Sequence, residues 1–273
     1  MRKRRQIRVA PLAMIGPYLI AMLLCGLVPL ILSIREVARP SWVNLDGSYT
    51  TFFRILKDFR VIPALWHTFF LLAIFVPLMI IFVLAISLLL DATPVRGNNF
   101  MRLVLLLPGV VSGGVAVMIW ISLLGPDINW NGSNVQWLIG AIAFTSGVGS
   151  WIVIQYGSLR SISQEVLEAA RVDGCNRLQI ALRIKLPMIG RYIGYMTIFL
   201  TAGAIQIYAE PTLLMSTGLT TDWSLNQVAY SYAFRTGDFA GGTALSLDML
   251  LPNIILGIIF ILRTDFIKKG ART

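Results

Sequence analysis

The sequence predicts an all-α, polytopic membrane protein with six transmembrane helices, and three observations support this fold class. Only 13% of the 273 residues are charged, whereas soluble domains carry about 25%. The apolar residues, which give a mean hydropathy of +0.75, gather in six long runs. Most runs reach or exceed the ~20 residues that a bilayer requires. The basic residues also favour alternate connections between the runs. One membrane domain over residues 1–273 accounts for the whole chain.

The six expected spans follow one another along the chain. They cover residues 9–34, 64–90, 103–126, 137–159, 192–209 and 243–262. The first lies between Arg8 and Arg35 and is too long for the apolar core of a signal peptide, so we interpret it as an uncleaved helix. The second has His67 near its outer end, and the sixth contains Asp248.

The connections between the spans differ in character. Residues 35–63 carry enough apolar side chains to pack as short helices on the outer membrane surface, whereas 91–102 is short and cytoplasmic. Residues 125–136 are dense in turn-forming residues. Residues 210–242 form a longer outer segment, which we interpret as partly re-entrant and facing a cavity.

The distribution of basic residues predicts the orientation. Both termini, the second-to-third connection and the fourth-to-fifth connection share one side, which carries 17 of the 23 Lys and Arg residues. The positive-inside rule therefore predicts that both termini and residues 161–187 are cytoplasmic. The net charge of +10 follows from this topology, so we expect no nucleic acid partner.

The sequence lacks the residue patterns of the common catalytic and metal sites. It contains no phosphate-binding GxxxxGK[ST] loop and no HExxH, GxSxG or CxxC pattern. His67 is the single histidine, and we expect it to pack or hydrogen-bond at the membrane interface. Cys25 and Cys175 are too far apart in the topology to pair, and we expect both to be structural. No catalytic residue, metal site or cofactor is expected in this chain.

If the protein performs work, the energy must come from an ion gradient or from a partner protein. An ion-coupled secondary transporter needs ionisable groups inside the bilayer, and Asp248 is the clear candidate. It lies 15 residues before Arg263, or roughly 22 Å along a helix, which places it in the outer half of the membrane. A partner-driven transporter needs a rigid cytoplasmic attachment instead.

Residues 161–187 have the pattern of such an attachment. Ser161 and Gln164 have capping-box spacing, which predicts a helix over 162–173. Asp173 and Gly174 predict its end, and Asn176 with Gln179 predicts a second helix start. Pro187 ends that second helix or begins the next one.

The same segment resembles the EAA loop of binding-protein-dependent ABC importer permeases. The matching residues are Glu168, Ala169, Ala170, Asp173, Gly174, Ile184, Leu186 and Pro187. The resemblance continues elsewhere in the chain, at Phe100, Arg102, Leu107, Pro108, Trp120 and the segments 42–68 and 228–247. These segments are similar to the corresponding parts of permeases in the carbohydrate-uptake branch of this family. Within that branch, they resemble the first permease of a heterodimer of the maltose or glycerol-3-phosphate type.

Two positions depart from the family pattern. The family often has Thr-x-Gly-Gly-Pro after the fifth helix, whereas residues 216–220 read Ser-Thr-Gly-Leu-Thr. The proline that is common after the Leu-Pro pair is also missing. The first departure limits what can be carried over about the substrate, and the second leaves the coupling pattern intact.

The resemblance implies a set of partners. It implies a second permease subunit, two cytosolic ATPase subunits that hold ATP and magnesium, and an extracytoplasmic solute-binding protein, in the cytoplasmic membrane of a bacterium or archaeon. Helix 162–173 would then lie in a groove of the ATPase, with Glu168 paired to a basic residue and Ala169 and Ala170 allowing close approach.

Several polar or aromatic residues near the last two spans are candidates for the sugar pathway. They are Gln206, Tyr208, Glu210, Asp248 and Asn253. Such groups hydrogen-bond hydroxyls or stack on sugar faces, although hydrogen bonds between helices are an equally good explanation for each.

Overall fold

The computed structural model describes residues 9–40, 42–43, 45, 47–92, 104, 113–124, 135–215 and 219–263. Within these ranges every regular element is a helix. Five helical segments are long and apolar enough to cross a membrane, and a shorter apolar helix, Gly113–Leu124, accompanies them. The prediction of an all-α, multi-pass membrane protein is therefore confirmed.

The observed spans overlap five of the six that the sequence predicts. They are Ile15–Val37, Val61–Ala92, Val135–Arg160, Gly190–Leu214 and Phe239–Leu262. Val61–Ala92 begins three residues before the expected 64, and Gly190–Leu214 extends beyond the expected 209. The expected third span lies partly outside the described residues, so the count of six helices stays a prediction, as does the single domain over 1–273.

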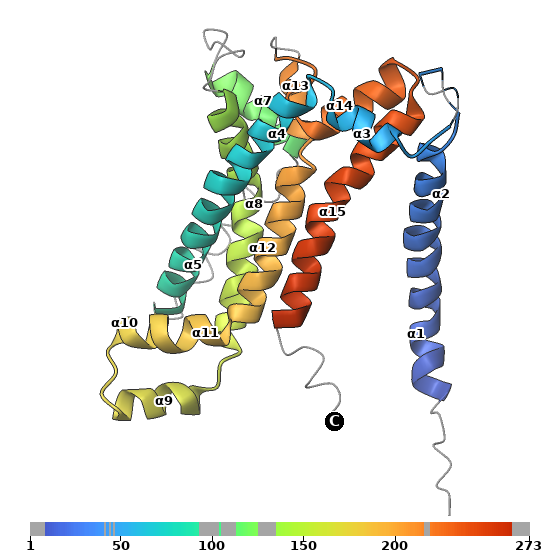
Figure 1. Ribbon diagram of the computed structural model, residues 1–273. Helices are drawn as coiled ribbons and strands as arrows, with labels where there is room; N and C mark the ends of the chain where they lie inside the picture. The colour runs from blue at the N-terminus through green and yellow to red at the C-terminus, as the bar shows by residue number, and fades with distance from the viewer. Residues whose placement is uncertain are drawn as a thin grey trace, which may run out of the picture. The chain divides into compact units, whose positions relative to one another are not determined.

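The chain divides into two compact units, and the first comprises residues 1–57 and 229–248. It contains α1 (Val9–Met22), η1 (Leu23–Leu27), α2 (Val28–Val37), α3 (Thr51–Leu56), η5 (Ser231–Arg235) and the first part of α15 (Phe239–Arg263) (Figure 1). Helix α3 is a short helix within the connection 35–63, where the sequence predicts short helices. Ile55 of α3 is fully buried, and a Cβ atom on Gly241 of α15 would lie 3.0 Å from its side chain.

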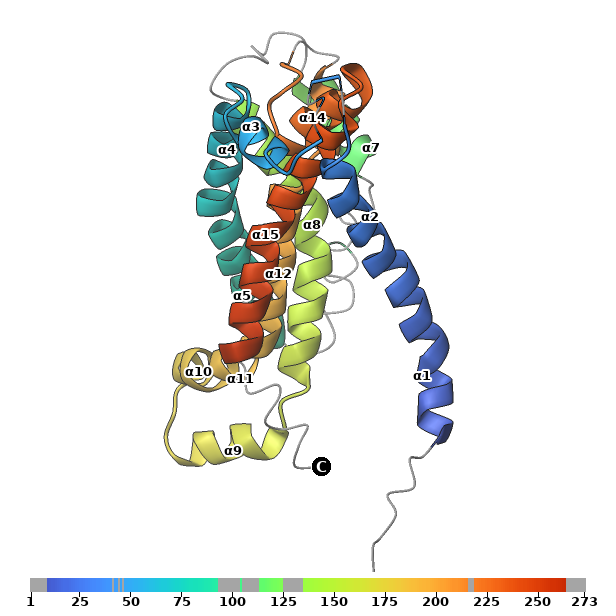
Figure 2. The ribbon, with the colours of Figure 1, turned by 45° about the vertical axis from the view of Figure 1, so that its right-hand side comes forward.

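The second unit comprises residues 58–228 and 249–273. Its elements are α4 (Val61–Phe70), η2 (Leu71–Phe75), α5 (Val76–Ala92), α7 (Gly113–Leu124), α8 (Val135–Arg160), α9 (Gln164–Val172), α10 (Arg177–Gln179), η3 (Ile180–Lys185), α11 (Leu186–Met188), α12 (Gly190–Ile205), α13 (Ala209–Leu214), most of α14 (Leu225–Tyr230) and the last part of α15. Helices α5, α8 and α12 run side by side in both views (Figures 1 and 2).

Two glycines in the second unit leave room for aromatic rings of neighbouring helices. A Cβ atom on Gly140 of α8 would lie 2.0 Å from the ring of Phe75, and one on Gly194 of α12 would lie 1.9 Å from the ring of Phe260. Small residues let helix backbones approach closely in membranes, where packing replaces the hydrophobic effect as the driving force. These two contacts therefore position α8 against η2 and α12 against α15.

Three π-helical turns share one cause. η1, η2 and η3 end two residues before Pro29, Pro77 and Pro187, respectively. Proline has no N–H group, and its ring clashes with the carbonyl four residues earlier. A π turn widens the helix by one residue, so that the residue before each proline bonds five residues back. The helices therefore continue past these prolines rather than ending there.

Candidate functional site

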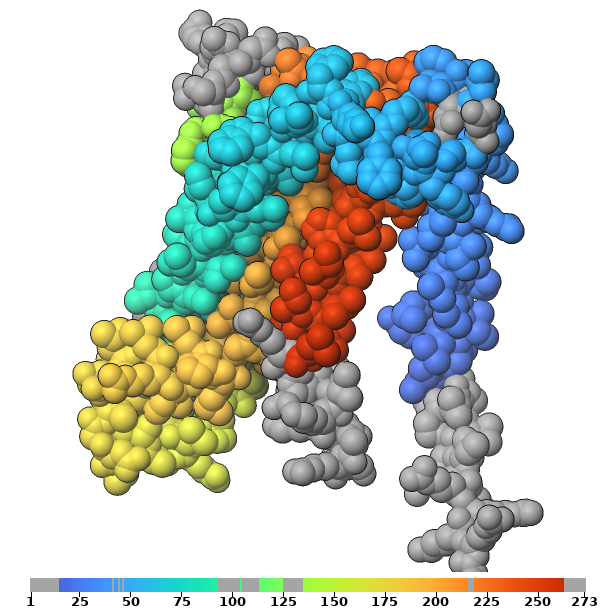
Figure 3. Space-filling model, viewed as in Figure 1, coloured from blue at the N-terminus to red at the C-terminus, as the bar shows by residue number. Residues whose placement is uncertain are grey.

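Residues 161–187 fold as a helical hairpin at one end of the second unit. Helix α9 lies alongside the α10–η3–α11 stretch (Figures 1 and 2). In the space-filling view the hairpin is a solid block that continues from the end of α5 (Figure 3). A helix held in this way can transmit force to the helices that carry it.

The turn between the two arms has the geometry that the sequence predicts. Gly174 adopts a left-handed φ of 81°. Its N–H donates to Arg171 O at 3.1 Å, and the N–H of Cys175 donates to Ala170 O at 3.0 Å. Together these two bonds form a Schellman motif, which satisfies the last carbonyl groups of α9. The residue after the helix end must therefore tolerate positive φ.

The two predicted helix starts have different outcomes. Asn176 and Gln179 form a capping box, with both side chain-to-backbone distances at 2.8 Å. The capping box at Ser161 and Gln164 was wrong. Ser163 is the N-cap of α9 and makes no capping bond with its side chain. The Ser161 hydroxyl instead donates to Ser158 O at 2.7 Å, because Ser161 belongs to the turn that ends α8.

The residues of the EAA pattern divide between two faces. Leu167 and Ala170 are each 6% exposed. They belong to a hydrophobic cluster with Leu159, Ile162, Ile180 and Ile189, against which Ile184, Leu186 and Cys175 pack. Glu168 and Ala169 lie on the exposed side of α9, where Val172 is 88% exposed. Ala170, Ile184 and Leu186 therefore attach α9 to the protein, and Glu168 and Ala169 are accessible to a partner.

An ion pair that the sequence analysis missed also attaches the hairpin. The ammonium of Lys185 in η3 donates to a carboxylate oxygen of Asp91 in α5. The two side chains are only 16% and 8% exposed. Asp91 is an acidic residue at the end of an otherwise apolar span, and this position was the signal in the sequence that could have indicated the pair. The pair joins the hairpin directly to a membrane-spanning helix.

A cavity of about 450 Å³ lies in the second unit among η2, α5, α8, α12 and α13. It is lined by Leu71, Phe75, Val76, Met79, Gly140, Ala143, Phe144, Ser146, Phe199, Leu200, Gly203, Ala204, Gln206, Ile207, Tyr208, Ala209 and Glu210. The structure therefore brings three of the five predicted pathway residues to one cavity. Asp248 and Asn253 are not among the lining residues.

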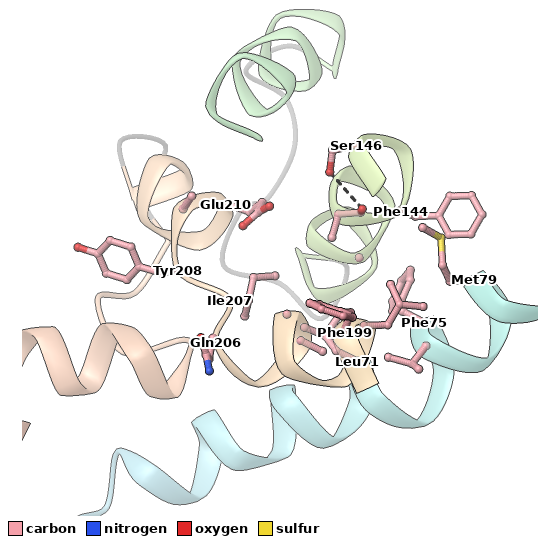
Figure 4. A pocket seen from close by; sticks show the side chains of 17 residues that line it. Leu71, Phe75, Met79, Phe144, Ser146, Phe199, Gln206, Ile207, Tyr208 and Glu210 are labelled. Carbon is pink, nitrogen blue, oxygen red and sulfur yellow. Dashed lines mark hydrogen bonds between the residues drawn. The ribbon is translucent and has the colours of Figure 1, made fainter. Parts of the chain in front are cut away.

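The three predicted residues differ in how they meet this cavity (Figure 4). The carboxylate of Glu210 extends toward the α8 side, and the ring of Tyr208 extends in the opposite direction. A Cβ atom on Gly113 of α7 would lie 3.4 Å from a carboxylate oxygen of Glu210. Among the described residues no ion pair or hydrogen bond to the Glu210 side chain is found.

The segment that follows α13 is tied to neighbouring helices by two hydrogen bonds. His67 Nδ1 donates to the carbonyl oxygen of Trp223 at 2.9 Å, and the two rings stack with centroids 4.7 Å apart. The Asn226 amide donates to Gln206 O at 3.1 Å. The packing and hydrogen-bonding role predicted for His67 is confirmed. The predicted re-entrant course of residues 210–242 stays a prediction.

A second buried ion pair lies in the first unit. Arg54 of α3 donates to Asp238 Oδ2 at 2.7 Å, and Asp238 is 1% exposed. Asp238 precedes α15, and its other oxygen accepts from the N–H of Gly241 at 3.0 Å. One carboxylate therefore caps α15 and holds α3 against it.

We expect Arg54→Ala to lower the stability of the protein substantially. The substitution leaves the buried carboxylate of Asp238 without its cation, and such a loss costs about 3 kcal/mol. The measurement is thermal unfolding of the purified protein in detergent. Arg39→Ala is the matched control, because the Arg39–Glu36 pair is exposed (71% and 32%) and should contribute less than about 1 kcal/mol. Equal shifts for the two variants would contradict this assignment.

Comparisons with known proteins reveal relatives of one kind. No family model matches the chain. It is 29% identical over 246 residues to the probable ABC transporter permease protein YesP of Bacillus subtilis, covering 80% of this chain and 78% of the relative. It is 23% identical to the arabinooligosaccharides transport system permease protein AraP of Halalkalibacterium halodurans, covering 96% of this chain and 90% of the relative.

Solved structures share the fold. A bacterial ABC transporter involved in the import of the acidic polysaccharide alginate superposes with a TM-score of 0.70 and 16% identity, over 92% of this chain and 95% of the solved one. A structure of a bacterial alginate ABC transporter in complex with an alginate pentasaccharide-bound periplasmic protein gives a TM-score of 0.71, 17% identity and 91% coverage of each chain. The chain is therefore similar in sequence to permease proteins of ABC transport systems, and it shares the fold of a chain of a solved ABC importer.

Proposed function

We propose that this chain and a second permease subunit form the membrane pathway of a binding-protein-dependent sugar importer, powered by two cytosolic ATPase subunits that bind ATP and magnesium. The observation that carries the proposal is the exposed Glu168–Ala169 face of α9 on a buried attachment. Its relatives support a sugar as cargo, since one is named for arabinooligosaccharide transport. The complex of the alginate transporter with its periplasmic protein supports a binding protein as partner.

In this proposal α9 docks in a groove of an ATPase subunit. Glu168 pairs with a basic residue there, and Ala169 lets the two backbones approach. Gly174 sets the angle between the arms of the hairpin, while Ile184, Leu186 and Pro187 continue it into α12. Closure of the ATPase pair then moves the hairpin, and the hairpin moves the membrane helices. This arrangement requires both termini to lie on the cytoplasmic side of a bacterial or archaeal cytoplasmic membrane.

The cavity serves as part of the sugar pathway in the same proposal. Its volume of about 450 Å³ is within the roughly 300–1,000 Å³ of small-ligand sites. The aromatic rings of its lining pack against the C–H faces of a sugar, and its polar groups at Gln206 and Glu210 hydrogen-bond hydroxyls.

Reconstitution tests the proposed function. The chain, its partner permease, the ATPase pair and the binding protein are placed in proteoliposomes with a labelled sugar outside. We expect uptake only when ATP and magnesium are present on the ATPase side and the binding protein is on the other. Uptake by the chain alone under a proton or sodium gradient would instead establish a secondary transporter.

A further inference from the structure

We propose that the cavity selects neutral or amino sugars and excludes anionic ones such as uronates and sugar phosphates. This inference rests on the proposed function and names the chemical class of its cargo. The feature that supports it is the charge of the cavity lining. Glu210 contributes a carboxylate, and no Lys, Arg or His is among the described residues that line the cavity.

The surroundings of Glu210 strengthen the effect of its charge. Most of the lining is apolar and includes the rings of Phe75, Phe144 and Phe199. Charges interact more strongly in such an environment than in water. Glu210 also belongs to the apolar segment Gly190–Leu214, which is long enough to cross a membrane. Ionisable residues are costly in such segments and are usually functional.

The Glu210 carboxylate is available to a ligand. It is half-buried, and it has no ion pair or hydrogen bond in the part of the chain that the structure describes. A Cβ atom on Gly113 of α7 would lie 3.4 Å from a carboxylate oxygen of Glu210, which is an ordinary van der Waals contact.

The chemistry of a carboxylate then determines the class of cargo. An ionised carboxylate only accepts hydrogen bonds. It can bind two sugar hydroxyls or one ammonium group, each of which donates. A uronate or phosphate adds a second negative charge, and its anionic group offers Glu210 no hydrogen-bond donor. No cationic side chain among the described lining residues is available to pair with that group. The cargo thus differs from that of the solved transporter with the same fold, which is an acidic polysaccharide.

The test uses the complete transporter in proteoliposomes and matched probes that differ in one substituent and therefore in charge. Each trio consists of a neutral sugar, its uronic acid and its amino sugar, beginning with glucose, glucuronate and glucosamine and continuing with other hexoses and their disaccharides. The measurement is the ATPase activity that each probe stimulates in the presence of the binding protein. We expect stimulation by neutral or amino members and none by uronates or sugar phosphates.

Variants of Glu210 distinguish the selectivity of the cavity from that of the binding protein, because the binding protein is the same in every assay. Glu210→Gln keeps the shape but removes the charge. We expect it to reduce uptake of the stimulating probe at least about tenfold, because hydrogen bonds to charged groups are the strong ones. Glu210→Asp keeps the charge and should retain more uptake than Glu210→Gln. Glu36→Gln is the control, because Glu36 does not line the cavity and the same change there should leave uptake unaltered.

The possible results distinguish this inference from the proposed function. Stimulation only by uronates or sugar phosphates would overturn the inference and leave a sugar importer. Normal uptake by Glu210→Gln would also overturn it. If no sugar of any class stimulates the complete transporter, the proposed function itself is wrong and the inference is wrong with it.

Discussion

Gly174→Val is expected to abolish sugar uptake while the protein remains in the membrane. Gly174 holds a φ of 81°, a region that β-branched residues almost never adopt. Valine would therefore force the backbone out of the Schellman turn and change the angle between α9 and the second arm. The membrane helices do not depend on this turn, so insertion should persist. The measurement is ATP-dependent uptake in proteoliposomes, normalised to the amount of membrane-inserted protein.

Gly174→Asn is the matched control at the same position. Asparagine tolerates the left-handed region and is found at helix ends for this reason. A Cβ atom on Gly174 would meet nothing within 4 Å, so neither substitution crowds a neighbour within the chain. The asparagine variant should therefore keep a large part of the uptake. If valine and asparagine were equally active, the backbone of this turn would not matter for coupling.

The membrane helices were predictable because hydropathy is a property of contiguous residues. The apolar runs located five observed spans with ends shifted by a few residues. The π turns before Pro29, Pro77 and Pro187 were not foreseen, since a proline in an apolar run reads equally well as a kink or a helix end.

The hairpin of residues 161–187 was predictable to the extent that its geometry is local. The Asp173–Gly174 turn and the Asn176–Gln179 capping box each involve residues within a few positions of one another. The division of the EAA residues into a buried and an exposed face was not predicted. It depends on which side of α9 meets α8 and η3, and the motif spacing alone does not specify that.

The two buried ion pairs and the cavity lining depend on contacts between distant segments. Lys185 and Asp91 are 94 positions apart, and Arg54 and Asp238 are 184 apart. No local pattern connects such residues. Glu210 was predicted as a pathway residue because it follows the fifth span closely. The aromatic residues that share its cavity lie within uniformly apolar runs, where no sequence signal separates a cavity-lining phenylalanine from a lipid-facing one.

Reversing the charge of Lys185 is expected to uncouple the transporter. In Lys185→Asp the buried carboxylate of Asp91 loses its cation and faces a second carboxylate. Removing one partner of a buried ion pair costs about 3–5 kcal/mol, and adding a like charge increases that cost. The hairpin should then detach from the end of α5, so that its movement no longer reaches this helix. We expect uptake to fall at least about tenfold, measured per assembled transporter.

A variant in which the two charges are exchanged distinguishes loss of the ion pair from misfolding of the protein. Asp91→Lys combined with Lys185→Asp restores opposite charges at the same two positions, and we expect it to recover much of the uptake that either single variant loses. A double-mutant cycle isolates this interaction, because residues in direct contact have non-additive effects. If the double variant were as inactive as the single ones, the ion pair would not be the connection between the hairpin and α5. Recovery would establish that this ion pair is required for coupling between the hairpin and α5.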